Sequence, residues 1–270
     1  MPPLEIINQA SQQLLTTSPS QARDILRQLV NEFSNGSYLI TSGNIVDETG
    51  GTTPDYEAVI HAKYDPAPQN PSSIPADAAA VVFCICDNMT VADLRAAYDK
   101  IKQAKYLKKK PAVDGRSTIT LGIILALKTD LTLNQIADEI ERLNARTPDR
   151  IWTDMVAVVS SGILNYQGQF VTQDMGGDWL PPAEGAAANQ TMPIYVVTVL
   201  KPTGDYTLHA LLHYTMGHLM VFGAAPQLTD ITPAIDNLPK HGVVRQGYQY
   251  NLSGVLRPVP EETALLDCHE

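Results

Sequence analysis

Cys84 and Cys86 are the residues whose type and spacing most directly suggest a chemical site. Side chains at positions i and i+2 of a β-strand point to the same face, so both thiols would lie on one side of a sheet. Two thiolates and an imidazole can hold a soft metal such as Zn²⁺, and His61 or Glu57 could lie nearby. Free cysteine is also among the most buried residue types, so the pair is more typical of two small core residues than of a metal site.

His209 and His213 have the i, i+4 spacing that metal-binding helices use. No glutamate follows His209, so the zinc-protease motif is absent. His218 is out of phase with both. The pattern therefore favours packed or hydrogen-bonded histidines over a metal site, and we predict no bound metal.

Positive charge is concentrated between positions 91 and 116, where eight basic residues stand against three acidic ones, although the chain as a whole has a net charge of −10. Most of the surface should therefore repel a polyanion. We predict that any contact with nucleic acid or an acidic partner uses Lys105, Lys108, Lys109 and Lys110. The simpler alternative is a solvated helix face that ends in a charged loop.

Composition excludes several classes of protein. The 270 residues are 44% hydrophobic, enough for a sizeable core, and three cysteines cannot build a disulfide framework. The first residues lack a basic region followed by an apolar core, and no apolar run reaches membrane-spanning length. We expect a cytoplasmic protein with no membrane segment.

Hydrophobic periodicity predicts an α/β fold, with a central mixed β-sheet flanked by helices. Four strands are expected in one sheet, at Tyr38–Val46, Tyr56–Tyr64, Ala78–Cys86 and Ser117–Leu127. A strongly amphipathic helix, capped by Thr90, should pack on that sheet. We assign residues 1–225 to one domain, with 1–17 as a helical extension, and residues 226–270 to a mostly irregular tail.

Two long segments carry a family resemblance. The string SYLITSGNIVDETGGTTPDYEAVIH, followed by AAAVVFCICDNMTVADLRAAYDKIKQAKYLKKKP, resembles a restriction-endonuclease-like bacterial family of the PD-(D/E)xK superfamily. The later segments MVAVVSSGILNYQGQ and LHALLHYTMGHLM continue the match, which covers roughly residues 20–222. It rests on the order and spacing of the elements more than on rare residues.

The resemblance implies a nuclease core in which carboxylates from two neighbouring strands hold Mg²⁺ and a lysine two residues further on assists the chemistry. The family's helix acid falls on Asp24 and its first strand acid on Glu57. Its E-x-K positions fall on Cys84 and Cys86. Cysteine cannot supply a hard oxygen ligand or a permanent ammonium, so the resemblance predicts a degenerate active site.

We therefore expect a non-catalytic protein of restriction-endonuclease-like fold that needs no cofactor. It would bind a protein partner or nucleic acid, in bacterial defence against foreign DNA, and the resemblance is compatible with a homo-oligomer. One alternative is an active Mg²⁺-dependent DNA endonuclease that uses Asp24, Glu57 and Asp87 as its acids. Another is a metal-sensing or small-molecule-sensing module built on the Cys84–Cys86 strand.

Overall fold

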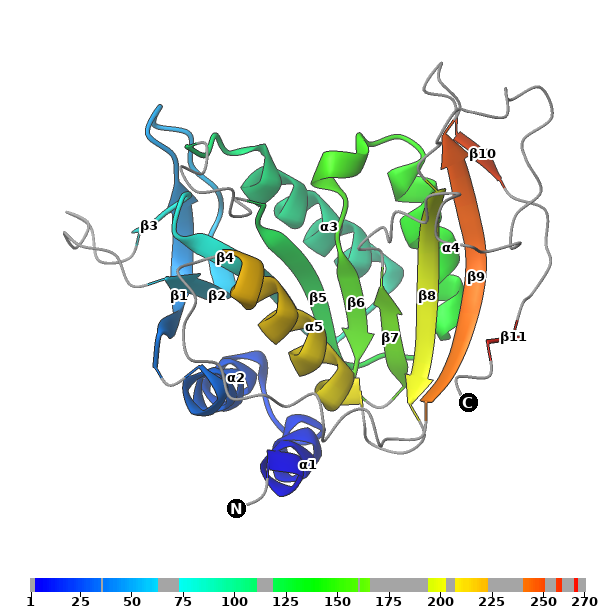
Figure 1. The fold of residues 1–270 in the computed structure, drawn as a ribbon, viewed down its shortest axis with the longest axis horizontal. Helices are drawn as coiled ribbons and strands as arrows, with labels where there is room; N and C mark the ends of the chain where they lie inside the picture. The colour runs from blue at the N-terminus through cyan, green and yellow to red at the C-terminus, as the bar shows by residue number, and fades with distance from the viewer. Residues whose placement is uncertain are drawn as a thin grey trace.

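The computed structural model describes residues 3–34, 36–62, 73–110, 119–159, 161–165, 194–202, 207–222, 240–250, 256–258 and 265–266. A mixed β-sheet forms the centre of the molecule, with helices on both faces (Figure 1). Its strands lie in the order β10-β9-β8-β7-β6-β5-β4-β2-β1-β3, with β11 also paired to β9. The strands are β1 (Tyr38–Val46), β2 (Tyr56–Ala62), β3 (Ser73–Pro75), β4 (Ala79–Asn88), β5 (Leu121–Lys128), β6 (Met155–Val158), β7 (Gly162–Asn165), β8 (Ile194–Pro202), β9 (Lys240–Tyr250), β10 (Leu256–Pro258) and β11 (Leu265–Leu266).

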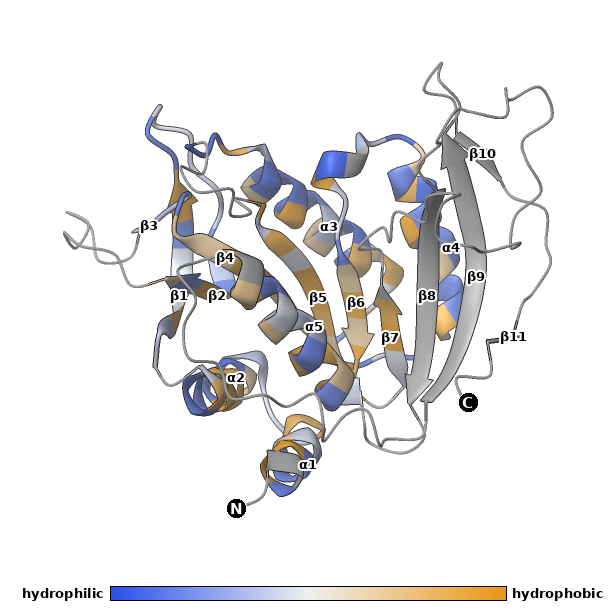
Figure 2. Ribbon diagram, viewed as in Figure 1, coloured by the Kyte–Doolittle hydropathy of each residue, from blue (hydrophilic) through white to orange (hydrophobic). Residues whose placement is uncertain are grey.

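The central strands β4, β5 and β6 run parallel, and β2 pairs antiparallel with β4. Helices α1 (Pro3–Leu14), α2 (Pro19–Phe33) and α5 (Thr207–Phe222) cover one face of the sheet, and α3 (Val91–Tyr106) and α4 (Leu133–Asn144) cover the other (Figure 1). Because helices cover both of their faces, β4 and β5 are nearly continuous apolar runs (Figure 2).

Alternate residues of each central strand belong to two separate cores. Phe83 and Ile123 pack with α1, α2 and α5, whereas Val82 and Ile124 pack with α3 and α4. Strand parity therefore decides which helices a side chain meets, and it places the predicted site on the α3 face.

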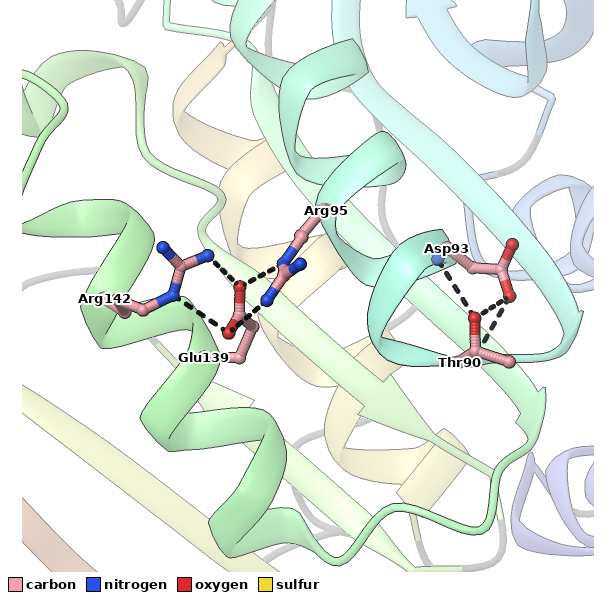
Figure 3. Close-up of polar contacts among 5 residues, drawn as sticks. All are labelled: Thr90, Asp93, Arg95, Glu139 and Arg142. Carbon is pink, nitrogen blue, oxygen red and sulfur yellow. Dashed lines mark hydrogen bonds and ion pairs between the residues drawn. The ribbon is translucent and has the colours of Figure 1, made fainter.

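Capping residues mark the first turns of α3 and α4, the two helices that cover this face of the sheet. Thr90 donates from its backbone N to Asp93 Oδ2 at 2.9 Å, and its Oγ1 accepts from Asp93 N at 3.3 Å (Figure 3). Thr132 forms the same reciprocal cap with Gln135 at the start of α4. A single carboxylate, Glu139 of α4, then joins the two helices by binding Arg95 of α3 and Arg142 of its own helix (Figure 3).

The four predicted strands correspond to β1, β2, β4 and β5 and lie in one sheet, as expected. Inside the C-terminal segment predicted to be mostly irregular, the structure has a long strand that the sequence analysis did not expect, β9. It pairs antiparallel with β8 from Ile194↔Gln249 to Pro202↔Lys240. Pairing with a neighbouring strand, rather than any alternation in its own sequence, makes this segment a strand. In the described part of the chain, no helix has both the length and the apolarity needed to cross a membrane.

Candidate functional site

The structure brings Glu57, Cys84 and Cys86 together on the α3 face of the sheet. Ala58 of β2 lies opposite Phe83 of β4, so the preceding residue, Glu57, lies beside Cys84. Cys84 belongs to the core under α3, and Cys86 packs against the same core. Three of the four positions named from the sequence therefore share one site.

The side chain of Lys100 on α3 extends toward this site and binds the carboxylate of Glu57. Its Nζ lies 2.7 Å from Glu57 Oε1, and the other oxygen, Oε2, accepts a longer hydrogen bond of 3.4 Å from the backbone N of Ile85. Tyr56 makes two contacts with Lys100. Its hydroxyl donates a hydrogen bond to the backbone carbonyl of Lys100 at 2.6 Å, and the centroid of its ring lies 5.4 Å from Lys100 Nζ. Both oxygens of Glu57 are thus engaged by the protein itself.

The two thiols are held in their neutral form. Cys84 is 3% exposed, and its Sγ lies 3.7 Å from the carbonyl oxygen of Ala97 on α3. Burial raises the pKa of the Cys84 thiol far above its usual range. Burial also raises the pKa of the half-buried Cys86 to about 11, and the negative charges of Asp93 and Glu57 add to that shift. Neither sulfur is a ready nucleophile or metal ligand at neutral pH, because the thiolate is the reactive form.

The fourth predicted position, Asp24, is not part of this cluster. It lies on α2, which packs on the opposite face of the sheet, and its carboxylate forms ion pairs with Arg23 and Arg27. Asp87, the third acid of the alternative, is exposed near the end of β4 and has the opposite strand parity to Cys86. The functional roles of these residues stay predictions.

Divalent metals of the nuclease type require several hard oxygen ligands. This site offers one carboxylate, already paired with an ammonium, and two neutral thiols. The residues present do not fit Mg²⁺. Across the described residues, no group of three or more His, Cys, Asp or Glu side chains is arranged to hold a metal ion.

His61, His213 and His218 each contact a neighbouring side chain or backbone carbonyl, and for the helical histidines this is the arrangement that the sequence favoured. His61 is 2% exposed, with its Nε2 at 3.1 Å from Thr41 Oγ1 and its Nδ1 at 3.0 Å from the Ala62 carbonyl. His213 contacts Tyr214 edge to face, and His218 Nε2 lies 3.2 Å from the carbonyl of Ala80. Burial lowers the pKa of both His61 and His218, which favours neutral rings.

The four lysines predicted as one binding surface are divided between the interior and the exterior. The Lys105 side chain is 4% exposed and forms an ion pair with Asp154. Lys109 Nζ donates to the Ala79 carbonyl at 2.8 Å and lies 4.8 Å from the centre of the Phe222 ring. Burial lowers the pKa of Lys109 to about 7. Two of the four predicted lysines therefore point inward, Lys105 from the last turn of α3 and Lys109 from the chain after it.

Lys108 and Lys110 remain on the outside, beside a groove of about 420 Å³. Acidic residues line the same groove: Asp47, Glu48 and Asp77. Lys110 Nζ lies 3.5 Å from Glu48 and 3.9 Å from Asp77. The positive field at this surface is thus weaker than the sequence suggested.

Comparisons with known proteins give the fold. No protein-family model and no curated protein matches the chain. Among solved structures, it is similar to P. aeruginosa ATCC27853 NucC in its cAAA-bound form, with 13% identity and a TM-score of 0.55 over 84% of this chain and 92% of that one. E. coli MS115-1 NucC matches in its apo form (14% identity, TM-score 0.56, 83% of this chain and 93% of that one) and in its cAAA-bound form (12%, 0.56, 84% and 93%).

This chain has a restriction-endonuclease-like α/β fold. The sequence resemblance predicted that fold, and the structural neighbours confirm it. At these identities the similarity concerns the fold alone, so the chemistry of the site depends on its own residues.

Sequence reasoning missed the role of Lys100, which it counted only as one charge of the basic stretch. A signal was available in the helical spacing. Lys100 follows the buried Ala97 by three residues and precedes the buried Ile101, so it lies at the border of the helix face that packs on the sheet.

Proposed function

We propose that this chain is a non-catalytic protein of nuclease fold that acts in bacterial defence by binding a partner. The observation that carries the proposal is the contact between Lys100 and Glu57 above the two thiols. The Lys100 ammonium binds the Glu57 carboxylate, which in a nuclease would bind the metal ion. The neighbouring strand, β4, supplies no second carboxylate to this site.

The packing supports the same conclusion. Phosphodiester cleavage needs space for a metal ion, a water molecule and a phosphate at the second carboxylate position. Cys84 fills that position in close contact with the Ala97 carbonyl and is almost fully buried. Helix α3 thus packs directly on the second carboxylate position and leaves no room for a metal ion there.

One observation favours the alternative of an active nuclease. Lys100 supplies an ammonium within reach of Glu57, so a lysine from α3 could replace the one missing at Cys86. Catalysis would still need a second hard ligand, and Asp93, the acid nearest to Cys86 on α3, has its Oδ2 occupied by Thr90. For this reason we place the active nuclease second.

A plasmid-cleavage assay with Mg²⁺ or Mn²⁺ tests the proposal. We expect no cleavage by the wild type and no difference between the wild type and Glu57→Gln. Cleavage that Glu57→Gln abolishes, while Asp24→Asn leaves it intact, would refute the non-catalytic proposal and identify Glu57 as the essential acid. Cleavage that survives both changes would come from a contaminating nuclease.

The partner is proposed to be a protein or a nucleic acid. Because NucC has been seen in a cAAA-bound form, cAAA is the first nucleotide ligand to test against this chain. Isothermal titration with cAAA, and fluorescence anisotropy with duplex DNA at low salt, separate these ligands. If neither cAAA nor duplex DNA binds, a protein remains as the proposed partner.

A further inference from the structure

The start of β4 contains a β-bulge. Ile60 of β2 lies opposite Val81 of β4. The next residue of β2, His61, lies opposite Ala79, so Ala80 is an extra residue on β4. On the other side of the strand, the parallel pairing with β5 begins only at Val81. Ala79 and Ala80 therefore lie outside the regular ladder, and their carbonyl groups are open to side-chain donors.

Two titratable side chains from different elements use these carbonyls, where α5 ends beside the start of β4 (Figure 1). His218, in the last turns of α5, has its Nε2 at 3.2 Å from the Ala80 carbonyl. Lys109, which follows α3, donates from Nζ to the Ala79 carbonyl at 2.8 Å. Its Nζ also lies 4.8 Å from the centre of the ring of Phe222, the last residue of α5. We call the pair of His218 and Lys109 the α5 latch.

The charged groups around the α5 latch do not offer an acid for each of its members. His218 is acted on by Asp154, which precedes β6, and by Lys109 itself. Asp154 is already engaged, because its carboxylate forms an ion pair with Lys105 at 2.5 Å. Lys109 is acted on by Asp77 and by Lys105. A positive charge on His218 would therefore be repelled by Lys109, while the acid that faces it is neutralised by another lysine.

Burial opposes the charged form of both members of the α5 latch. It lowers the pKa of Lys109 to about 7. It also lowers the pKa of His218, and the charge of Lys109 adds to this shift. Asp154 and the backbone of Ala80 and Ile119 act in the opposite direction but do not outweigh burial.

The sign of the pH dependence follows from these shifts. A group whose pKa is lowered in the packed state takes up protons more readily when it is released, so acid favours release. For Lys109 this effect accumulates between its ordinary pKa of 10.5 and about 7. For His218 it begins below about pH 6.5, the ordinary pKa of histidine. His218 therefore decides the response between about pH 7.5 and about pH 5.5, a range in which Lys109 becomes charged.

We propose that the α5 latch is an acid-sensitive switch: it fastens the last turn of α5 to the bulge of β4 at neutral pH, and this turn detaches when His218 and Lys109 are both charged. Tyr38 contacts the same turn in a way that does not titrate in this range, because its hydroxyl donates to the Leu219 carbonyl at 2.8 Å. Leu219 and Phe222 are buried in the core beneath α5, so detachment would expose them to water. This proposal is independent of whether the nuclease site is catalytic.

Hydrogen–deuterium exchange of the full chain, followed by mass spectrometry at about pH 7.5 and about pH 5.5 and corrected for the intrinsic exchange rate, tests the switch. We expect the protection of the C-terminal half of α5 to fall several-fold at the lower pH, while that of α4 changes little. Helix α4 is a suitable internal reference, because the shifted pKa values of its Glu139 and Arg142 lie outside this pH range. Unchanged protection of α5, or an equal loss in both helices, would overturn the proposal.

Two histidine variants assign the response to the α5 latch. His218→Gln keeps an N–H group that can donate to the Ala80 carbonyl but cannot take up a proton, so it should remove most of the dependence on pH. The matched control on the same helix is His213→Gln, which should respond like the wild type because His213 contacts Tyr214 edge to face instead of the β4 bulge. A wild-type response in a folded His218→Gln would contradict the proposal.

Lys109→Met provides a second variant if His218→Gln folds poorly by circular dichroism. It removes the charge that repels a protonated His218, so the loss of protection at about pH 5.5 should be smaller than in the wild type. Tyr38→Phe shows what a purely structural contact does, since it should lower the protection of α5 by the same factor at both pH values. If Lys109→Met and His218→Gln also change protection by one factor at both pH values, the pair is only structural and the proposal is wrong.

Discussion

Lys100 of α3 and Glu57 of β2 form an ion pair of 2.7 Å between helix and sheet, and the family resemblance assigns Glu57 to the first metal-binding acid of a nuclease. The pair fixes the mid-point of α3 over the thiols of Cys84 and Cys86. In the proposed non-catalytic function, this packing contact replaces the metal-binding group of a nuclease.

The first prediction concerns that pair. A double-mutant cycle of Glu57→Gln and Lys100→Met should give a coupling energy of about 1 kcal/mol in urea unfolding, because both side chains are partly shielded from water. The matched control is the more exposed pair Asp99–Lys102 on the same helix, which should give only a few tenths. Equal coupling in the two cycles would argue against a structural role for the Lys100–Glu57 contact.

Acid should destabilise the protein through His61. Burial lowers the pKa of His61 in the folded state, so the unfolded chain binds more protons than the folded one as the pH falls below about 6.5. This contribution to stability is present above that pH and is lost below it. Urea unfolding at about pH 7.5 and about pH 5.5 should therefore show a larger loss for the wild type than for His61→Gln, which cannot take up the proton. An identical loss in both proteins would exclude His61 as the cause.

Alkali should have the opposite effect through Lys109. Its pKa is lowered to about 7 from the ordinary value of 10.5, so between these pH values the unfolded chain binds more protons and stability rises with pH. Lys109→Met keeps an aliphatic chain against Phe222 and removes the charge. We expect this variant to be more stable than the wild type near pH 7 by about 1 kcal/mol, with a flatter dependence on pH. A destabilised Lys109→Met would show that the bond to Ala79 outweighs the cost of burial.

DNA binding, if the protein has it, should depend on Lys108 and Lys110, because Lys105 and Lys109 point inward. Changing both outer lysines to alanine should reduce the slope of log affinity against log salt by no more than about 2, at about 0.9 for each phosphate contact. The melting temperature should hardly change, since exposed charges contribute little to stability. An undiminished slope would place the contact elsewhere on the molecule.

The cap of α3 gives a prediction of stability alone. Thr90→Ala removes the hydroxyl that accepts from Asp93 N and should cost about 1 kcal/mol in urea unfolding. Thr132→Ala, the equivalent change in α4, should cost a similar amount. Thr90→Ser, which keeps the hydroxyl, should lose little, and an equal loss in Thr90→Ser and Thr90→Ala would show that the methyl group matters instead.

The fold class could be predicted from local patterns and the order of the elements along the chain. The apolar runs of β4 and β5, the stripe of α3 and the caps at Thr90 and Thr132 each appear within a few residues of the chain. The parity that places Cys84 and Cys86 on one face follows from the same short-range geometry. For this reason the shared face of Glu57 and the thiols could also be expected before any coordinates were known.

The surroundings of those residues depend on tertiary packing and could not be predicted in the same way. The number of lysines in the sequence does not show which of them are exposed. It does not reveal that Lys100 contacts the sheet or that Lys105 and Lys109 point inward. Nor does it reveal that acidic side chains line the same groove as Lys110. These facts depend on how α3 and the chain after it lie on strands distant in sequence. The long β9 was likewise missed, because its strand structure comes from hydrogen bonds to β8, and such pairing leaves little trace in the sequence of one strand alone.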